Sequence, residues 1–172
     1  MNAYKLAIWE EMKKFAVIPN SVFLGQQVAA EDFYGTLKDI PLEKRMEMPV
    51  AEELQLGMSI GMALQGYLPI SIYQRMDFLP RACDQLVNHL DLIKELSCGK
   101  FKPKVIIRTT IGVKHPLDTG LQHSKNLIDG FRHLLKNTPV VDVKTSEEVR
   151  DAYQLARKIK SSIMIVEYQE LY

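Results

Sequence analysis

Two groups of neighbouring residues combine side chains that enzymes use for chemistry. Glu52 and Glu53 open a largely apolar stretch, and His123 and Ser124 stand side by side in a region that contains glycine and proline. The helix dipole favours acidic residues in a first turn, so position alone favours a structural role for both glutamates. Adjacent side chains rarely face each other as a nucleophile and its base must, so His123 and Ser124 do not predict nucleophilic catalysis.

Other common sites are missing from the sequence. It has no G-x-G-x-x-G and no G-x-x-x-x-G-K-[ST] motif, so nothing in it is expected to cradle a phosphate unaided. No set of His, Cys and Glu residues has the spacing of metal ligands, so we expect no metal site on this chain. The two cysteines, Cys83 and Cys98, are too few for a disulfide framework and indicate a reducing compartment.

Composition predicts one soluble domain over residues 1–172. The chain is 47% hydrophobic and 25% charged, and 22 Lys and Arg against 21 Asp and Glu leave a formal net charge of +1. That balance lacks the basic excess of a nucleic-acid-binding protein. Charged residues near the N-terminus argue against a signal peptide, and Gly66 and Pro69 interrupt the uncharged stretch 54–74. We therefore expect a cytoplasmic protein that binds neither nucleic acid nor membrane.

Helical and strand patterns alternate along the chain. Helices are expected at 4–15, Glu52–Leu64, 77–93 and 127–135, and after a capping box formed by Thr145 and Glu148. Short apolar strands are expected at Ser21–Gly25, 68–72, 104–108, Val140–Val143 and 163–167. Asp77 is expected to cap the third helix, and residues 26–48 to form a long loop.

This order of elements predicts an α/β fold. Continuous apolar strands separated by helices indicate a single three-layer, doubly wound domain with a mainly parallel sheet. Ligands of such sheets bind beyond the carboxyl ends of the strands. The predicted functional rim therefore comprises residues 25–27, 73–77 and 109–124.

Longer strings of residues carry a more specific signal. MPVAEELQLGMSIGMALQGYLPI resembles the Pro-x-x-Glu…Gly…Gly…Gly-x-x-Pro stretch of the pyrimidine-binding domain of the thiamine-diphosphate transketolase superfamily. DFLPRACDQLVNH, KVIIRTTIG and GLQHSKN are similar to the elements that follow it in that family. The Asp-Gln and Gln-His-Ser versions are most like β subunits of 2-oxoacid dehydrogenase decarboxylating components. The resemblance extends from the first helix to the final VEYQELY.

The resemblance implies roles for four residues. Glu52 aligns with the glutamate that touches the aminopyrimidine ring, where a carboxylic acid on the ring nitrogen helps the amino group to take up a proton. Phe78 aligns with the aromatic residue that stacks on this ring, and Gln74 with a neighbour at the preceding strand end. His123 aligns with a histidine near the substrate carboxylate. Without the motif, Phe78 fits core packing equally well, and a lone loop histidine such as His123 is more often solvated.

The sequence also departs from the family pattern. Gln26 and Gln27 follow the first strand where the family usually has an acidic residue, and Ile72 replaces another common acid. The family's C-terminal domain is not recognised here, and neither is the Gly-Asp-Gly…Asn motif that binds the diphosphate. The resemblance therefore implies that a diphosphate-binding, α-type partner chain completes the thiamine diphosphate site and carries the Mg²⁺.

These features predict a pyrimidine-binding subunit of a split enzyme that decarboxylates a 2-oxo acid and transfers the resulting fragment. Two alternatives stay open: a transketolase-like or carboligating enzyme without lipoyl transfer, and a non-catalytic assembly or regulatory subunit. We expect a hetero-oligomer of the α2β2 kind, or a homo-oligomer. Gly57 and Gly61 lie four residues apart, and permit close approach either of another helix or of the domain's own sheet.

Overall fold

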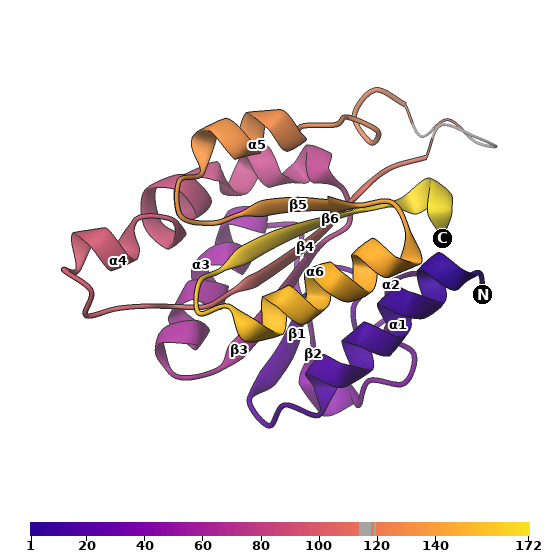
Figure 1. Ribbon diagram of the computed structural model, residues 1–172, viewed down its shortest axis with the longest axis horizontal. Helices are drawn as coiled ribbons and strands as arrows, with labels where there is room; N and C mark the ends of the chain where they lie inside the picture. The colour runs from indigo at the N-terminus through magenta and orange to yellow at the C-terminus, as the bar shows by residue number, and fades with distance from the viewer. Residues whose placement is uncertain (114–117, 119) are drawn as a thin grey trace.

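A parallel sheet forms the centre of the computed structural model, which describes residues 1–113, 118 and 120–172 (Figure 1). In this part of the chain six strands follow the order β2-β1-β3-β4-β6-β5, and every neighbouring pair is parallel. The strands are β1 (Ser21–Gly25), β2 (Arg45–Glu47), β3 (Leu68–Tyr73), β4 (Ile106–Ile111), β5 (Val140–Val143) and β6 (Ile163–Tyr168).

Helices cover both faces of the sheet. One face carries α1 (Ala3–Ala16) and α6 (Ser146–Lys158). The other carries α3 (Glu52–Leu64), η2 (Met76–Ala82), η3 (Asp84–Leu90), α4 (Ile93–Leu96) and α5 (Ile128–Leu134). The short segments are α2 (Asp32–Gly35), η1 (Leu42–Lys44) and η4 (Gln169–Leu171). The predicted α/β class is confirmed, with a sheet that is wholly parallel.

Two apolar cores result from the alternation of side chains along the strands. Ile106 and Ile165 point into the core under α1 and α6, whereas Ile107 and Met164 point into the core under α3 and α5. A strand whose two faces are both buried reads as a continuous apolar run, which explains why the central strands could be found from sequence.

The segment predicted as a loop at 26–48 contains ordered structure, so that prediction is wrong. β2 pairs with β1 at the edge of the sheet, and the Glu47 carboxylate accepts hydrogen bonds from backbone N–H groups between positions 27 and 30. Asp32, Phe33 and Tyr34 have φ between 42° and 56°, a left-handed conformation that is costly outside glycine. A three-residue edge strand is too short to show a period, so the pattern missed it.

The predicted helix at 77–93 is irregular. It consists of 3₁₀ turns (η2), a π-helical segment (η3) and the short α4. Asp77 is not the cap, because the first helical residue is Met76 and the position before it is Arg75. Instead, both Asp77 carboxylate oxygens lie 3.3 Å from the backbone nitrogen of Lys125. Asp77 thus holds a rim loop against this helical segment.

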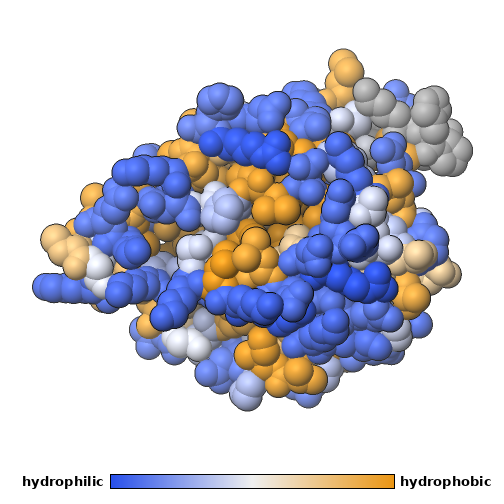
Figure 2. Space-filling view, viewed as in Figure 1, coloured by the Kyte–Doolittle hydropathy of each residue, from blue (hydrophilic) through white to orange (hydrophobic). Residues whose placement is uncertain are grey.

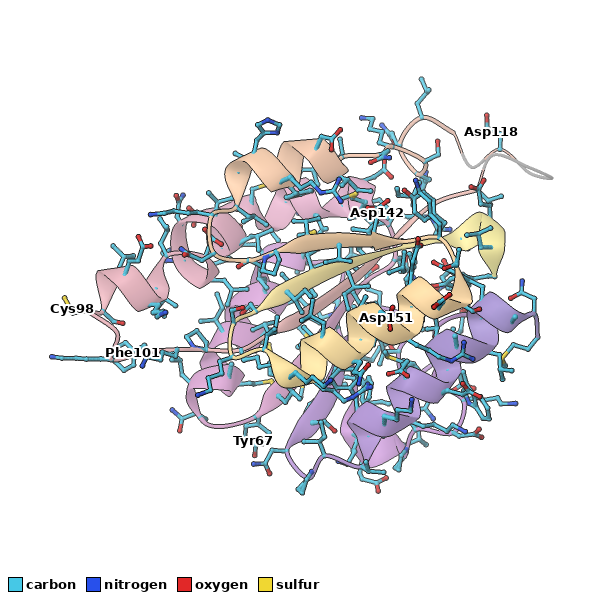
Figure 3. All side chains as sticks on the ribbon, in the orientation of Figure 1. Tyr67, Cys98, Phe101, Asp118, Asp142 and Asp151 are labelled. Atoms are coloured by element: carbon cyan, nitrogen blue, oxygen red, sulfur yellow. The ribbon has the colours of Figure 1, made fainter. Side chains whose placement is uncertain are left out.

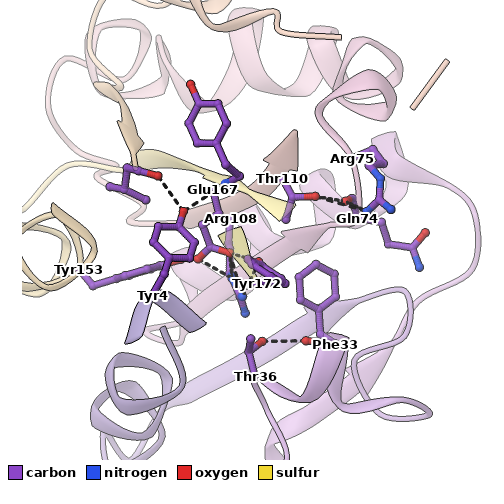
Figure 4. A network of polar contacts seen from close by, with 12 residues as sticks. Tyr4, Phe33, Thr36, Gln74, Arg75, Arg108, Thr110, Tyr153, Glu167 and Tyr172 are labelled. Atoms are coloured by element: carbon purple, nitrogen blue, oxygen red, sulfur yellow. Dashed lines mark hydrogen bonds and ion pairs between the residues drawn. The ribbon is translucent and has the colours of Figure 1, made fainter. Parts of the chain in front are cut away.

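A buried ion pair joins β4 to β6 (Figure 4). Arg108 and Glu167 are both fully buried, and the Arg108 Nη2 to Glu167 Oε2 distance is 2.9 Å. The hydroxyls of Tyr153 and Tyr172 also donate to this carboxylate. Although burial alone has the opposite effect, Glu167 raises the pKa of Arg108, so the guanidinium stays charged.

Two surface features complete the fold. Figure 2 shows an apolar area between α5 and α6, next to the polar surfaces of these helices. Cys98 is exposed in the projecting segment after α4 (Figure 3). Cys83 is half-buried, and burial raises the pKa of its thiol. Across the described residues, no helix has the length and apolar character needed to cross a membrane.

Candidate cofactor site

The first turn of α3 positions Glu52 at the carboxyl edge of the sheet. Gln55, one turn later, donates from Nε2 to the carbonyls of Leu24 and Ile72 and to the Ser71 hydroxyl, at 3.0 to 3.3 Å. These bonds fix the start of α3 to both β1 and β3. As a result Glu52 is only 2% exposed, although it belongs to a first helical turn.

Three residues with predicted roles lie around one narrow space, which we call the Glu52 crevice. Glu52 approaches it from α3, Gln74 from the end of β3 and Phe78 from η2. The remaining lining residues are Gln26, Gln55, Ile72 and Tyr73. The structure therefore brings together Glu52, Gln74 and Phe78. The crevice leaves no room for a water molecule in this conformation.

Two polar side chains approach the Glu52 carboxylate. Gln26 Nε2 donates to Oε1 across 3.4 Å, and Arg81 Nε lies 3.0 Å from Oε2. The second contact lacks hydrogen-bond alignment, so Oε2 has no hydrogen-bond donor among the described residues. Burial, and secondarily the charge of Glu52, raises the pKa of Tyr73, so this neighbouring phenol stays neutral.

His123 lies beside the crevice, outside the set of residues that line it. Its ring is perpendicular to that of Phe78, with 5.6 Å between the centroids. A Cβ at Gly112 would lie 1.8 Å from the His123 carbonyl oxygen, so only glycine permits this approach of the loop to the end of β4. Positions 114–117 and 119 of the predicted rim segment lie outside the described residues.

Arg75 connects three parts of the rim, and the sequence patterns assigned it no role. Its Nη1 donates to the Tyr34 hydroxyl and the Gln74 carbonyl at 2.7 Å each, and to Thr110 Oγ1 at 3.4 Å. Figure 4 shows Gln74, Arg75 and Thr110 together. Arg75 thereby joins α2 to the ends of β3 and β4. Its place within the predicted rim, two residues after β3, was the only sequence signal.

An open groove of about 710 Å³ runs along α3 outside the crevice, and we call it the outer groove. Its lining includes Glu52, Leu54, Gly57, Met58 and Arg81. The Leu54 side chain is 51% exposed. A Cβ at Gly57 would meet only the Gln85 side chain, and one at Gly61 would meet nothing within 4 Å. The alternative in which these glycines pack against the domain's own sheet is therefore wrong.

The residues present fit the pyrimidine half of thiamine diphosphate. A buried carboxylate oxygen without an aligned donor, an aromatic ring and an amide border the same space. Among the described positions, no group of three His, Cys, Asp or Glu side chains could hold the metal ion that accompanies the diphosphate half. The arrangement can therefore orient a neutral heteroaromatic ring and exchange a proton with it.

Comparison with known proteins identifies the family. Residues 2–172 match the family described as "Transketolase, pyrimidine binding domain". The chain belongs to this family. The pyruvate dehydrogenase E1 component subunit beta of Cyanidium caldarium is 29% identical over 175 residues, which cover 99% of this chain and 52% of that protein. The Porphyra purpurea protein of the same name is 27% identical over 99% of this chain and 51% of its own length. This transketolase pyrimidine-binding chain thus spans about half the length of these relatives.

Solved structures support the same fold. A structure described as "Split gene transketolase, inactive beta4 tetramer" superimposes with a TM-score of 0.69 at 20% identity, over 97% of this chain and 50% of that one. Transketolase from Campylobacter jejuni gives a TM-score of 0.72 at 14% identity, over 95% of this chain and 25% of its own. The resemblance of this chain to transketolase-type pyrimidine-binding domains is confirmed.

Proposed function

We propose that this chain is the pyrimidine-binding subunit of a split thiamine-diphosphate enzyme that acts on a 2-oxo acid. The observation that carries the proposal is the convergence of Glu52, Gln74 and Phe78 on one crevice. Membership of the transketolase pyrimidine-binding family and similarity to pyruvate dehydrogenase β subunits support it. A second, α-type chain supplies the diphosphate and Mg²⁺ ligands, and the outer groove on α3 is the surface that it covers.

The roles of the side chains follow from their chemistry. When bound, thiamine diphosphate supplies a carbon nucleophile for the carbonyl group of the substrate. Glu52 holds a proton at Oε2 for exchange with the pyrimidine ring, and its burial keeps bulk water away from that proton. Phe78 orients the ring by stacking. Gln74, at the end of β3, contributes an amide to the wall of the site. His123, whose ring contacts Phe78, is the residue that we propose meets the substrate carboxylate.

Specific observations favour each of two alternatives. The similarity to a split-gene transketolase structure is compatible with a transketolase-like or carboligating enzyme that uses no lipoyl group. Gln26 contacts Glu52 at a position where the family usually has an acid, and an amide cannot relay a proton as a carboxylate can. That contact favours a non-catalytic assembly subunit. Whether Glu52 exchanges a proton separates the two enzyme alternatives from the non-catalytic subunit.

The test is proton exchange in the complete complex. Neighbouring reading frames are searched for a Gly-Asp-Gly…Asn chain, which is co-expressed with this one, and deuterium exchange at the reactive carbon of the cofactor is followed by NMR. Glu52→Gln is nearly isosteric but cannot donate and recover a proton. We expect it to slow the exchange by at least about 100-fold, the usual size of a general acid–base contribution.

Glu53→Gln is the matched control, because Glu53 is exposed and points about 100° away around the helix. It should leave exchange within about twofold of the wild-type rate. Assembly of both variants is checked by sedimentation. Equal exchange rates in wild type and Glu52→Gln would favour the non-catalytic alternative.

A further inference from the structure

Arg81 covers the carboxylate that the proposed chemistry needs. Glu52 is buried, whereas the Arg81 side chain is 69% exposed, and its Nε lies 3.0 Å from Glu52 Oε2. Arg81 follows Phe78 by three residues in η2, so one 3₁₀ turn places the Phe78 ring at the Glu52 crevice and the Arg81 guanidinium at the Glu52 carboxylate. Neither the family motif nor the sequence patterns assigned Arg81 a role.

The contact between Arg81 and Glu52 is a weak one. Oε2 faces the guanidinium without an aligned hydrogen bond, and a buried carboxylate oxygen in that state keeps an unmet demand for a donor. Glu52 is the one charged partner of Arg81 among residues 1–113, 118 and 120–172. A pair with one exposed, flexible member is held loosely. A ring nitrogen that shares a proton with Oε2 in an aligned hydrogen bond can therefore displace the guanidinium.

Arg81 also stands at the entrance to Glu52. It lines the outer groove together with Glu52, and it lines a second cavity of about 390 Å³ together with Phe78 and Lys125. Glu52 is reached from the first opening and Phe78 from the second. A ring that bonds to Glu52 Oε2 competes with the guanidinium, because Arg81 Nε lies 3.0 Å from that oxygen.

We propose that Arg81 is a positioning residue that occupies the Glu52 carboxylate in the unassembled chain and is displaced when a pyrimidine ring enters. The proposal rests on the proposed function. While Arg81 holds this position, Glu52 is not available to a pyrimidine ring. It becomes available only when a ligand or a partner offers the guanidinium another position. The exposed side of Arg81, next to Lys125, is where an anionic group would hold the displaced side chain.

The experiment measures how tightly the full chain binds 4-amino-5-hydroxymethyl-2-methylpyrimidine, the uncharged ring without its diphosphate. Arg81→Gln removes the charge and keeps a polar side chain of similar length. We expect it to bind the ring about fivefold more tightly than wild type, the size expected for the loss of one partly exposed ion pair. Arg81→Lys keeps the positive charge, so its affinity for the ring should fall back most of the way to that of wild type.

Three controls separate the contact from other effects. Lys125→Gln removes a positive charge from the same cavity without touching Glu52, and should bind the ring as wild type does. The double variant Arg81→Gln/Glu52→Gln should not show the tighter ring binding of Arg81→Gln, because Arg81 acts through Glu52. The ¹⁵Nε resonance of Arg81 should shift in Glu52→Gln without any ligand, which reports on the pair itself.

Each result decides the proposal. Binding to Arg81→Gln that is equal to wild type, weaker or absent overturns it, and so does a gain that persists in the double variant. An Arg81 resonance that Glu52→Gln leaves unchanged also overturns it, whatever the ligand does. The deuterium-exchange experiment on the assembled complex is independent of Arg81, so it shows separately whether the proposed function fails.

Discussion

At the scale of single residues, the buried carboxyl groups of Glu52 and Glu167 have opposite roles. Glu52 has an oxygen that lacks an aligned donor, which suits a ligand site. Glu167, by contrast, receives Arg108 and two tyrosine hydroxyls and has no capacity left for a ligand. Burial raises the pKa of Tyr153 and of Tyr172 well above the ordinary value, so both phenols remain donors. The Glu167 cluster is structural.

Glu167→Gln should therefore destabilise the fold strongly. The substitution leaves the Arg108 guanidinium buried without a counter-charge, and breaking such a pair costs about 3–5 kcal/mol. Urea denaturation measures the change in the free energy of unfolding. Glu170→Gln, on an exposed residue of η4, should stay within about 0.5 kcal/mol of wild type. A loss below about 1 kcal/mol in Glu167→Gln would contradict a charged pair at this position.

At the scale of elements, the edge strand β5 depends on a carboxylate. Asp142 accepts from Arg132 Nη2 of α5 at 2.8 Å and from the Tyr168 hydroxyl of β6 at 3.1 Å. Partial burial acts to raise the pKa of Asp142, but these hydrogen bonds and the nearby cations outweigh it and lower that pKa. The same residue thus fastens the edge strand to a helix and to the neighbouring strand.

The lowered pKa predicts how the stability of this edge responds to acid. The stabilisation from Asp142 is fully present above its unfolded pKa of about 3.9 and is lost as the pH falls through its lower folded pKa. Asp142→Asn should flatten this part of the acid unfolding curve, measured by circular dichroism between about pH 5 and pH 2. Asp151→Asn, on the exposed face of α6, is the control. Identical acid curves for Asp142→Asn and wild type would refute the contribution.

At the scale of the whole molecule, exposed apolar side chains gather at the start of α3. Leu54 lines the outer groove and is 51% exposed, and Val50, next in sequence to the groove residue Ala51, is 74% exposed. Apolar groups gathered in this way mark an interface.

We expect the purified chain to sediment as an oligomer at micromolar concentration. Leu54→Glu places a charge in the outer groove and should shift the chain towards monomer without unfolding it. Leu155→Glu makes the same change on α6, on the opposite face of the sheet, and should leave assembly intact. A stable, monodisperse wild-type monomer would count against an interface on α3.

Cofactor affinity is also a property of the whole assembly. The described residues offer a wall for the pyrimidine and no group of three His, Cys, Asp or Glu side chains that could hold Mg²⁺. This chain alone should therefore bind thiamine diphosphate weakly or not at all. Calorimetry with and without the diphosphate-binding chain measures the difference. Tight, Mg²⁺-dependent binding to the isolated chain would exclude a split site.

The sequence by itself determined the elements whose signals are local. The apolar runs of β1 and β3, the helix Glu52–Leu64 and the capping box of Thr145 and Glu148 are all present. Each depends on neighbours within a few positions, or on burial that makes a whole segment apolar. The family motif also indicated Glu52, Gln74 and Phe78 as site residues, and the three do lie together. Their roles remain predictions.

Only the tertiary structure decided which groups meet. Gln26 reaches Glu52 across 26 positions, and Arg108 reaches Glu167 across 59, distances that no local period encodes. β2 forms because β1 offers it a free edge, not because its three residues prefer a strand. No sequence pattern assigned Arg81 a role, and only the folded chain brings its guanidinium to a buried carboxylate. Such contacts depend on how strands order in the sheet, and that order is a property of the whole chain.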